Sequence, residues 1–453
     1  MIMQVIVLAA GEGERMSPLT SSHPKAMLPI GGRPLLEDLM TRAKEAGFGR
    51  FVIVVGHQKE KITDHFGDGS DFGVKIDYVV QEERLGTGHA LLLAEGLAED
   101  RFLVMNGDVL CDVPSLKKVA ESEGLAVAAA RVEEPDPNKD QILEVEEGLL
   151  KSVAERGKAP PSHLIYSGIC LLNRRIFDAL REAFESEGEG KETMDLDLLT
   201  GLKSLLAEGL QIEVIELESW IKITHPWDIL KANDTLMPTA TRGVLGEVEG
   251  GATITGEVAV GKGTSIRSGS YVAGPVVIGE GCDIGPNSLI KGPTSIGDHV
   301  QIGSGVVIER SVIMEGTEIS HLCYLGDSLI GQKSSLGAGT ILTNRRHDGS
   351  LVRSYVSGAK TETGRTKLGA IIGDGVKTGA GTIIYPGTVI EAGRWGRPGE
   401  VLWGYLEAEP KEAKEGNEGE ADPSEKNEAE EKNTTENAIY DASATEGRGS
   451  ETV

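Results

Sequence analysis

Aliphatic residues recur at every sixth position from about residue 248 onward, and this period restricts the possible folds more than any other feature of the sequence. Glycine and β-branched residues dominate the same stretch, and helical patterning is absent. Such a period is the signature of the hexapeptide β-helix, in which three hexads form one triangular coil around inward aliphatic side chains. We therefore predict an all-β, left-handed parallel β-helix. The unbroken series comprises Val248, Ile254, Val260, Ile266, Val272, Ile278, Ile284, Ile290, Ile296, Ile302 and Ile308.

The repeat then changes phase and is interrupted. A polar insert between Thr343 and Lys367 carries Arg345, Arg346 and Lys360. A loop that leaves a regular prism is a natural place for function, so we expect functional residues near it. The period slips after Ile308, resumes at Ile319 and Leu325, and resumes again at Ile372, Ile384 and Ile390.

The N-terminal half has a different texture, because apolar runs alternate with helical patterns from residue 1 to about 235. This alternation predicts an α/β domain with a mostly parallel, Rossmann-like sheet and helices on both faces. Ligands bind beyond the carboxyl ends of the strands in such sheets. We expect domains at 1–235 and 236–403 and a tail at 404–453. Strands are expected at 5–10, 51–55, 76–80, 102–105 and 126–131, and helices at 35–46 and 89–97.

A glycine-rich stretch, residues 8–32, follows the first predicted strand. Gly11 and Gly13 allow the backbone to turn tightly and to approach a ligand closely. Successive N–H groups in such a turn form a nest for phosphate oxygens, and Arg15 and Lys25 add two cations. The stretch is neither a Walker A loop nor a complete Rossmann fingerprint. We expect a nucleoside triphosphate site here, with an ordinary turn as the alternative.

Asp108 stands just beyond the predicted strand at 102–105. A carboxylate at the end of a strand suits a hard divalent cation, although a single aspartate there is more often a cap or turn residue. Gly86 and Gly88 flank Thr87 and predict a flexible turn before a helix.

Charge and cysteine content exclude several classes of function. The net charge is −26, which argues against nucleic acid and anionic membranes as partners. Residues 407–453 hold 15 acidic and 5 basic residues, so −10 of that charge lies in a tail that we expect to be disordered. The four cysteines show no CxxC spacing, which suggests neither a disulfide framework nor a zinc site. The N-terminus lacks the features of a signal peptide, and no apolar run is long enough to span a membrane. We expect a cytoplasmic protein.

The text of residues 8–36, LAAGEGERMSPLTSSHPKAMLPIGGRPLL, resembles the signature of the sugar-1-phosphate nucleotidylyltransferases. In that family a sugar 1-phosphate attacks the α-phosphorus of a nucleoside triphosphate, and pyrophosphate leaves. The resemblance implies that Arg15 grips the leaving phosphates, that Lys25 bridges the two reacting phosphates and that Asp108 binds Mg²⁺. It also implies that QEERLGTGHAL, residues 81–91, reads the base in a form most similar to uridylyltransferases. The implied substrate contacts are Ala10, Gly11, Gly13, Gln81, Gly86 and Thr87.

Several positions depart from the family pattern. Glu14 stands where the family usually has threonine, which adds negative charge near the phosphates. Lys222 occupies the place of the second Mg²⁺ ligand, and a charged lysine cannot ligate Mg²⁺. On the sugar side, Gln141 and Tyr166 replace the usual residues. The remaining candidates for sugar contacts are Glu155 and Gly168.

The C-terminal half carries HLCYLGDSLIG from His321 and LGAGTILTN, residues 336–344. These motifs resemble the acetyltransferase half of the archaeal-type bifunctional proteins of UDP-N-acetylglucosamine synthesis. The resemblance implies that His321 is the general base for transfer from acetyl-CoA to an amino sugar, a role that suits imidazole. It further implies homotrimers with sites between neighbouring prisms. The implied contacts are Tyr324, Asn344 and Lys367 for sugar phosphate and Ala380 for acetyl-CoA.

Together these features predict a bifunctional enzyme that acetylates an amino-sugar 1-phosphate and couples a sugar 1-phosphate, of N-acetylglucosamine or glucose, to UTP or dTTP with Mg²⁺. Two alternatives stay open. One is an acetyltransferase whose first half binds nucleotide without turnover, and the other is a non-catalytic regulatory or scaffold subunit. Lys222 favours the alternatives, whereas Arg15, Lys25 and Asp108 together favour activity.

Overall fold

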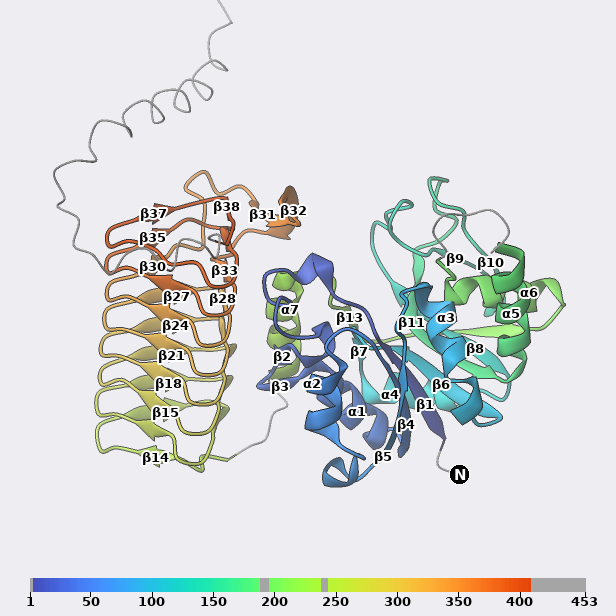
Figure 1. Ribbon diagram of the computed structural model, residues 1–453, viewed down its shortest axis with the longest axis horizontal. Helices are drawn as coiled ribbons and strands as arrows, with labels where there is room; N and C mark the ends of the chain where they lie inside the picture. Colours follow the sequence, from blue (N-terminus) through green and yellow to red (C-terminus); the bar gives the residue numbers. More distant parts are fainter. Residues whose placement is uncertain (1–2, 188–194, 238–242, 409–453) are drawn as a thin grey trace, which may run out of the picture. The chain divides into compact units, whose positions relative to one another are not determined.

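The computed structural model describes residues 3–187, 195–237 and 243–408 (Figure 1). These residues belong to one compact unit, residues 1–408. The predicted acidic tail lies outside the described residues from 409 onward, and the domain boundaries at 235 and 403 stay predictions. Within the described ranges, no helix has both the length and the apolar character needed to cross a bilayer.

A nine-stranded sheet with helices on both faces forms the N-terminal half, which confirms the predicted α/β class (Figure 1). Every predicted strand is present within one residue of its expected ends. In spatial order the strands are β5 (Lys75–Val80), β4 (Arg50–Val55), β1 (Gln4–Ala9), β6 (Arg101–Asn106), β11 (Leu164–Asn173), β8 (Leu125–Arg131), β12 (Ile212–Glu216), β10 (Leu149–Val153) and β9 (Leu143–Glu146).

The sheet is more mixed than predicted. The pairs β5–β4, β4–β1, β1–β6 and β8–β12 are parallel. In contrast, β11 is antiparallel to β6 and β8, and β10 is antiparallel to β12 and β9. Parallel neighbours need a crossover connection, usually a helix. The chain between β8 and β11 contains the β9–β10 hairpin instead, so β11 returns in the opposite direction.

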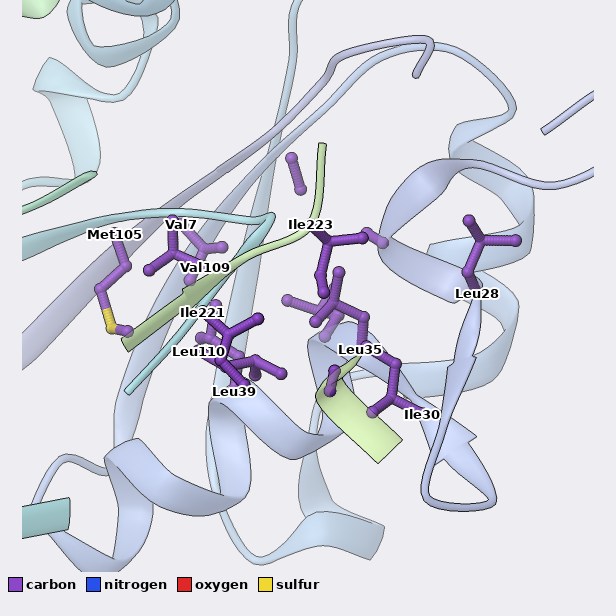
Figure 2. Close-up of a cluster of buried hydrophobic side chains, with 14 of the residues drawn as sticks. Val7, Leu28, Ile30, Leu35, Leu39, Met105, Val109, Leu110, Ile221 and Ile223 are labelled. Atoms are coloured by element: carbon purple, nitrogen blue, oxygen red, sulfur yellow. The ribbon is translucent and has the colours of Figure 1, made fainter. Parts of the chain in front are cut away.

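Alternate side chains of the central strands enter two different cores, as expected for a strand buried on both faces. Val5 and Val7 pack with α1 (Leu35–Glu45), α2 (Lys59–Phe66), α4 (Val113–Glu121) and α7 (Pro226–Leu236). Ile6 and Leu8 pack with α3 (Gly86–Leu93), α5 (Arg175–Glu187) and α6 (Leu198–Ala207). Figure 2 shows part of the first core, which contains Val7, Met105 and Leu39.

Two small antiparallel pairs flank the sheet. One consists of β2 (Pro29–Ile30) and β3 (Arg33–Pro34), directly before α1. The other joins β7 (Val109–Cys111) to β13 (Trp220–Lys222), and its register places Lys222 opposite Val109. This second pair brings a distant part of the chain to the carboxyl end of β6.

Three parallel sheets form the C-terminal half, which confirms the predicted β-helix (Figure 1). We name the three sheets after the character of their outward side chains, which is described below: polar, apolar and covered. The polar sheet contains β14 (Glu247–Val248), β17 (Ser265–Ile266), β20 (Asp283–Ile284), β23 (Gln301–Ile302), β26 (Glu318–Ile319), β29 (Ser335–Leu336) and β34 (Lys377–Thr378). The apolar sheet contains β15 (Thr253–Thr255), β18 (Tyr271–Ala273), β21 (Leu289–Lys291), β24 (Val307–Glu309), β27 (Tyr324–Gly326), β30 (Ile341–Leu342), β35 (Ile383–Ile384) and β37 (Val401–Leu402). The covered sheet contains β16 (Val258–Val260), β19 (Val276–Ile278), β22 (Thr294–Ile296), β25 (Val312–Ile313), β28 (Leu329–Ile330), β33 (Ile371–Ile372), β36 (Val389–Ile390) and β38 (Tyr405–Leu406).

The six-residue series marks the inward positions, and the phase slip has a simple cause. Ile278 pairs with Ile296, 18 residues later, which is one full coil of three hexads. Ile296 pairs with Ile313, only 17 residues later, because the corner before β25 is one residue shorter. At the first coil Val248 remains 37% exposed, since no coil precedes it.

The polar insert emerges where Ile330 pairs with Ile372 across an interruption of the coil. It contains the hairpin β31 (Val352–Val356) and β32 (Ala359–Arg365). One inward position is polar: Thr378 lies opposite Leu336, and its hydroxyl accepts a hydrogen bond from Gly337 N at 3.0 Å.

The outward side chains differ among the three sheets. Those of the polar sheet are Glu247, Ser265, Asp283, Gln301, Glu318, Ser335 and Lys377. On the covered sheet, Val312, Leu329, Ile371 and Val389 are buried in the core that also contains α1 and α7. The apolar sheet carries a column of mostly apolar side chains, and Tyr271, Ile341, Ile383 and Val401 in it are 37–42% exposed. One face of the β-helix is therefore apolar and open.

Candidate functional site

A cavity of about 490 Å³ lies beyond the carboxyl ends of β1 and β6, where the sequence predicts a nucleotide site. Ala10, Gly11, Gly13 and Arg15 line it, as predicted. Gly13 has a φ of +71°, and a β-carbon there would lie 3.0 Å from Lys25 Cβ. The tight turn therefore requires glycine, and the turn brings Arg15 and Lys25 to the same cavity.

Lys25 and Asp108 meet inside this cavity. Lys25 Nζ donates to Asp108 Oδ2 at 2.6 Å, and both side chains are less than a quarter exposed. Burial alone would raise the pKa of Asp108, but the nearby cations Lys25 and Lys222 outweigh it and hold this pKa below its ordinary value. The carboxylate is thus ionised and already carries one cation.

Lys222 stands beside the same carboxylate through the strand pair β13–β7. Ile223 N donates to Asp108 O at 2.9 Å, which fixes the end of β13 against the β6 terminus. Among residues 3–187, 195–237 and 243–408, no three His, Cys, Asp or Glu side chains are grouped to hold a metal ion. Mg²⁺ commonly binds through one or two carboxylates together with substrate phosphates. Asp108 therefore fits an ion that arrives with a triphosphate, not one held by the protein alone.

The predicted base-reading residues Gln81, Gly86 and Thr87 also line the cavity. Gln81 is 6% exposed, and its side-chain nitrogen donates to Gly86 O at 3.2 Å and to His89 Nδ1 at 3.1 Å. This arrangement requires an unprotonated Nδ1 on His89, and burial lowers the pKa of His89. Thr87 Oγ1 accepts from Leu198 N at 2.9 Å.

Two groups of cavity residues were missed from the sequence. Asp197 caps α6 through Leu199 N and contacts Thr87 Oγ1 at 3.3 Å and Gln141 Nε2 at 3.2 Å. An aspartate before an apolar helical run is a recognisable cap signal, so Asp197 could have been found. Arg84 forms ion pairs with Glu12 at 3.0 Å and with Glu14 at 3.2 Å. Arg84 thus offsets the negative charge that Glu14 adds near the predicted phosphate site.

The predicted sugar contacts are only partly brought to the cavity. Gly168 has a φ of +89°, and a β-carbon there would lie 2.8 Å from Nδ2 of Asn106, which lines the cavity. The lack of a side chain at Gly168 therefore leaves room for the Asn106 side chain at the cavity. Glu155 is exposed, pairs with Lys158 at 2.6 Å and is not part of the cavity lining. Tyr166 is directed to Cys170 Sγ at 3.6 Å, and burial raises its pKa well above the ordinary value.

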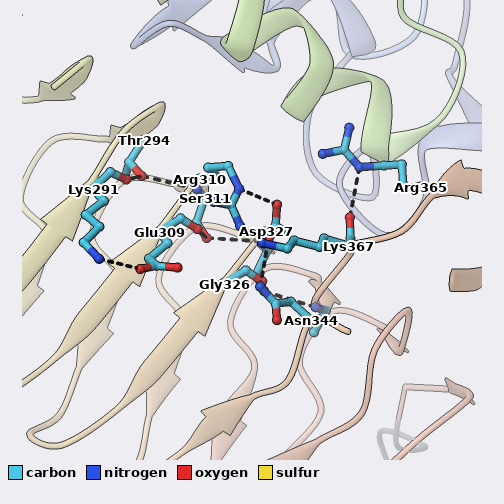
Figure 3. A network of polar contacts seen from close by, with 12 residues as sticks. Lys291, Thr294, Glu309, Arg310, Ser311, Gly326, Asp327, Asn344, Arg365 and Lys367 are labelled. Carbon is cyan, nitrogen blue, oxygen red and sulfur yellow. Dashed lines mark hydrogen bonds and ion pairs between the residues drawn. The ribbon is translucent and has the colours of Figure 1, made fainter. Parts of the chain in front are cut away.

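A second cluster of predicted residues lies on the apolar sheet of the β-helix (Figure 3). Asn344 Nδ2 donates to Asp327 Oδ2 at 2.6 Å and also hydrogen-bonds the Tyr324 hydroxyl. Burial, with the Glu309 and Asp327 carboxylates nearby, raises the pKa of Tyr324. Lys367 adjoins this group, because the next residue, Leu368, donates its N–H to Asn344 O at 2.9 Å.

Asp327 is held by an arginine that the sequence did not single out. Arg310 donates to both carboxylate oxygens of Asp327, at 2.8 and 2.7 Å, and the Asp327 side chain is 1% exposed. Both residues have positive φ, at the corners of successive coils. The one-residue slip before β25 places Arg310 at this corner.

His321 and Ala380 lie along one edge of the prism. Gly339 N donates to His321 O at 3.0 Å, and Gly381 N donates to Ala338 O at 2.8 Å. His321, Ala338 and Ala380 are therefore stacked on three successive coils, and both alanines belong to Gly-Ala-Gly-Thr sequences. His321 is exposed, and Tyr324 follows it on the same coil. The five predicted residues thus lie around the apolar sheet: His321 and Ala380 at the corner before it, Tyr324 on it, and Asn344 and Lys367 at the corner after it.

These observations define a class of protein: a nucleotide-site α/β fold joined to a hexapeptide β-helix with its own polar cluster. The nucleotidyl transferase family matches residues 4–237, and the GMPPB C-terminal domain family matches residues 272–393. A bifunctional protein GlmU of Methanococcus maripaludis strain C7 is 43% identical over 391 residues, 86% of this chain and 92% of that protein. A bifunctional sugar-1-phosphate nucleotidylyltransferase/acetyltransferase of Sulfurisphaera tokodaii is 35% identical over 413 residues, 88% of this chain and 97% of that protein.

The chain therefore belongs to the nucleotidyl transferase family, among its archaeal bifunctional nucleotidylyltransferase/acetyltransferases. A solved structure, the inositol-1-phosphate CTP transferase from T. maritima, shares 24% identity and covers 50% of this chain and 91% of its own, with a TM-score of 0.42.

Proposed function

We propose that the N-terminal cavity transfers a nucleotidyl group from UTP or dTTP to a sugar 1-phosphate, either N-acetylglucosamine 1-phosphate or glucose 1-phosphate. The observation that carries this proposal is the meeting of the Gly13 turn, Arg15, Lys25 and Asp108 in one cavity. An oxygen of the sugar phosphate attacks the α-phosphorus, and the bond to the leaving pyrophosphate breaks. No covalent nucleophile on the protein is needed, because holding two anions in line supplies much of the rate acceleration.

The residues of this cavity have distinct roles in the proposal. Arg15 contacts the leaving phosphates, and Lys25 lies between the two reacting phosphates. Gln81 and Thr87 face the base. Asp108 would hold Mg²⁺ together with substrate phosphates, and the ion would supply positive charge beside the α-phosphate.

Pyrophosphate release from UTP and N-acetylglucosamine 1-phosphate tests this reaction, with and without Mg²⁺. We expect Mg²⁺-dependent release by the unmodified protein and its loss in Lys25→Met. Lys222 beside Asp108 supports a second candidate, a nucleotide-binding half without turnover. No release by the unmodified protein, with release gained in Lys222→Asp, would establish that second candidate.

We also propose that the β-helix transfers acetyl from acetyl-CoA to the amine of an amino-sugar 1-phosphate. The stacking of His321 and Ala380 on one edge, beside the Tyr324–Asn344 pair, supports this proposal. The amine nitrogen attacks the acetyl carbonyl carbon, His321 accepts the proton from nitrogen, and the CoA thiolate leaves. Tyr324, Asn344 and Lys367 hold the sugar phosphate.

Thiol release from acetyl-CoA in the presence of glucosamine 1-phosphate or galactosamine 1-phosphate tests the second reaction. General-base catalysis contributes about 10²–10⁴-fold, so we expect His321→Ala to lower kcat by that range. Undiminished acetyl transfer by the His321→Ala variant would refute this mechanism. Thiol release without any dependence on either amino sugar would do the same.

We further propose that the chain forms a homotrimer through the apolar sheet. Apolar patches of this kind on soluble proteins mark sites of association. Within residues 243–408, the outward side chains of the covered and polar sheets form no open apolar column. Tyr271 and Ile383 stand in the open column, at 42% and 37% exposure. Light scattering on the full chain measures the mass in solution, and a charged residue in Ile383→Glu is expected to dissociate the assembly.

A further inference from the structure

We name residues 17–23 the linking segment, because they join the two cations of the nucleotide cavity. This segment contacts the β-helix at both of its ends. At the first end, Ser17 Oγ donates to Glu391 Oε1 at 3.1 Å. The Tyr405 hydroxyl donates to the same oxygen at 2.7 Å, so the Glu391 carboxylate is itself held in place. The chain that follows the first cation is therefore bound to one of the last coils of the prism.

The second end of the linking segment lies against Asp374, at the corner between β33 and β34. Ser22 Oγ donates to Asp374 Oδ2, and His23 Nδ1 lies 3.4 Å from the same oxygen. A β-carbon at the neighbouring Gly373 would lie 2.9 Å from Pro18 Cβ, so the backbone of this corner also contacts the segment. The chain that precedes the second cation is thus bound to the prism as well.

A comparison with an equivalent corner separates two roles of Asp374. Asp298 occupies the same corner three coils earlier, and both aspartates follow an Ile-Gly pair. Asp298 Oδ1 accepts from Glu280 N at 2.7 Å, and Asp374 Oδ1 accepts from Gln332 N at 2.7 Å, so each aspartate binds the backbone of the preceding coil. Asp298 is exposed, whereas the Asp374 side chain is only 16% exposed. One oxygen therefore serves the corner, and the second oxygen of Asp374 serves the linking segment.

The hydrogen bonds around Asp374 form a chain. The Ser22 hydroxyl has one proton and donates it to Asp374, so His23 Nδ1, 2.8 Å from Ser22 Oγ, donates to that oxygen. Burial alone would raise the pKa of Asp374, but the hydrogen bonds from His23, Ser22 and Gln332 N outweigh it and hold this pKa below its ordinary value. The carboxylate is ionised, and hydrogen bonds to a charged group are stronger than those between neutral groups.

We propose that Asp374 and Glu391 are positioning residues for nucleotidyl transfer, which hold the linking segment so that Arg15 and Lys25 stay aligned with the phosphates. The cations stand two residues before Ser17 and two residues after His23, so little chain separates each cation from a bound end. This inference rests on the proposed nucleotidyl transfer and gives the β-helix a part in it.

The proposal predicts a particular kinetic effect. Gln81 and Thr87 lie outside the linking segment, so recognition of the base does not depend on it. The two cations contact the phosphates, and a misplacement of about 1 Å at such groups can lower the rate about 100-fold. Loss of the contact with the β-helix should therefore lower kcat more than it raises KM.

Pyrophosphate release from UTP and N-acetylglucosamine 1-phosphate is measured in variants of Asp374. We expect Asp374→Ala to lower kcat by about tenfold or more and to change KM for UTP by less than about threefold. Asp374→Asn should restore most of kcat, because an amide can still accept from Gln332 N and donate to Ser22 Oγ. Acetyl transfer should be unchanged in both variants.

Asp298→Ala is the matched control, because it removes the equivalent backbone contact at an exposed corner. It is expected to retain the kcat of the unmodified chain. Unchanged kcat in Asp374→Ala, or an equal loss in Asp298→Ala, would overturn the positioning role.

A double variant shows whether Asp374 acts through the linking segment. Ser22→Ala removes the same hydrogen bond from the other side. If the two residues act through their contact, the losses of kcat in Ser22→Ala and Asp374→Ala should not multiply in the double variant. Losses that multiply in full would contradict the proposal.

Hydrogen exchange separates failure of this inference from failure of the proposed reaction. No pyrophosphate release by the unmodified chain would refute the reaction, whereas exchange in residues 14–28 reports the anchoring without catalysis. Because a hydrogen bond to a charged group is lost, we expect Asp374→Ala to accelerate this exchange by about tenfold or more, and Asp298→Ala to leave it unchanged. Equal exchange in the unmodified chain and Asp374→Ala would overturn the anchoring, whatever the activity.

Discussion

Replacing Arg310 with methionine tests how the polar cluster of the β-helix is held. Asp327 is 1% exposed and receives two hydrogen bonds from Arg310, at 2.8 and 2.7 Å. Removing one partner of a buried ion pair costs about 3–5 kcal/mol, because the other charge is left without compensation. Arg310 is 30% exposed and Asn344 still donates to Asp327, so we expect the lower end, about 3 kcal/mol.

Hydrogen exchange is the appropriate assay, since a chain with two folds need not unfold in one step. Local opening governs exchange, and about 3 kcal/mol corresponds to roughly 100-fold faster exchange. We expect this acceleration in the peptide that contains β27 and β28 and no change in β1. The KM for the amino-sugar phosphate is expected to rise as well, because Asp327, the partner of Asn344, is no longer held by Arg310.

The double variant Arg310→Met/Asp327→Asn separates the stranded charge from lost packing. Asparagine tolerates the positive φ of 48° at this position, and it removes the uncompensated carboxylate. We expect the double variant to recover most of the protection. Exchange in Arg310→Met within threefold of the unmodified chain, or a double variant as damaged as the single one, would refute the reasoning.

Three further outcomes are expected. Gly13→Ala should weaken triphosphate binding by at least tenfold in a titration, because the positive φ alone costs about 1–2 kcal/mol and the new methyl group would press on Lys25. Nucleotide affinity should be constant above pH 6.5 and should fall as the pH drops through the lowered pKa of His89. Protonation of His89 Nδ1 removes the acceptor of the hydrogen bond from Gln81, so His89→Asn should flatten this pH profile. Ile302→Ala should lower the free energy of unfolding of the β-helix in urea by about 2–5 kcal/mol, because Ile302 is buried inside the prism. Val248→Ala should lower it by under about 1 kcal/mol, because Val248 is exposed at the first coil, and equal losses in the two variants would contradict the inward assignment of Ile302.

The regular parts of both folds could be predicted because a simple period encodes them. Side chains inside a prism must be aliphatic at every sixth position, so Ile302 and its equivalents identify the coils directly. The corner before β25 is one residue shorter than the corresponding corner of the preceding coil, and the sequence shows this only as a slip in the six-residue period. The consequence of the shorter corner could not be predicted from the sequence. That consequence is the position of Arg310 beside Asp327, a contact between residues 17 positions apart on different coils.

Long-range pairs explain the other differences. The resemblance located Lys25 and Asp108, but their 2.6 Å contact arises only when the glycine-rich turn meets the end of β6. Arg84 could not be assigned from the sequence, because its ion pairs with Glu12 and Glu14 join two loops about 70 residues apart. The β9–β10 hairpin changed the direction of β11 for a similar reason, since alternation of apolar runs does not reveal strand direction.

The outward positions of the β-helix contain information that the six-residue period does not. The inward residues of all three sheets are almost all aliphatic. The outward residues differ, because the polar sheet carries Glu318 and Lys377, whereas the covered sheet carries Leu329, which is fully buried. The inward residues determine that a prism forms, whereas the outward residues determine what lies against each face. The Tyr324–Asn344 pair lies on the apolar sheet, the face with the open apolar column. If neighbouring subunits occupy this face, as proposed, the acetyl-transfer site is completed by assembly, and Ile383→Glu should lower acetyl transfer and trimer formation together while leaving pyrophosphate release unchanged.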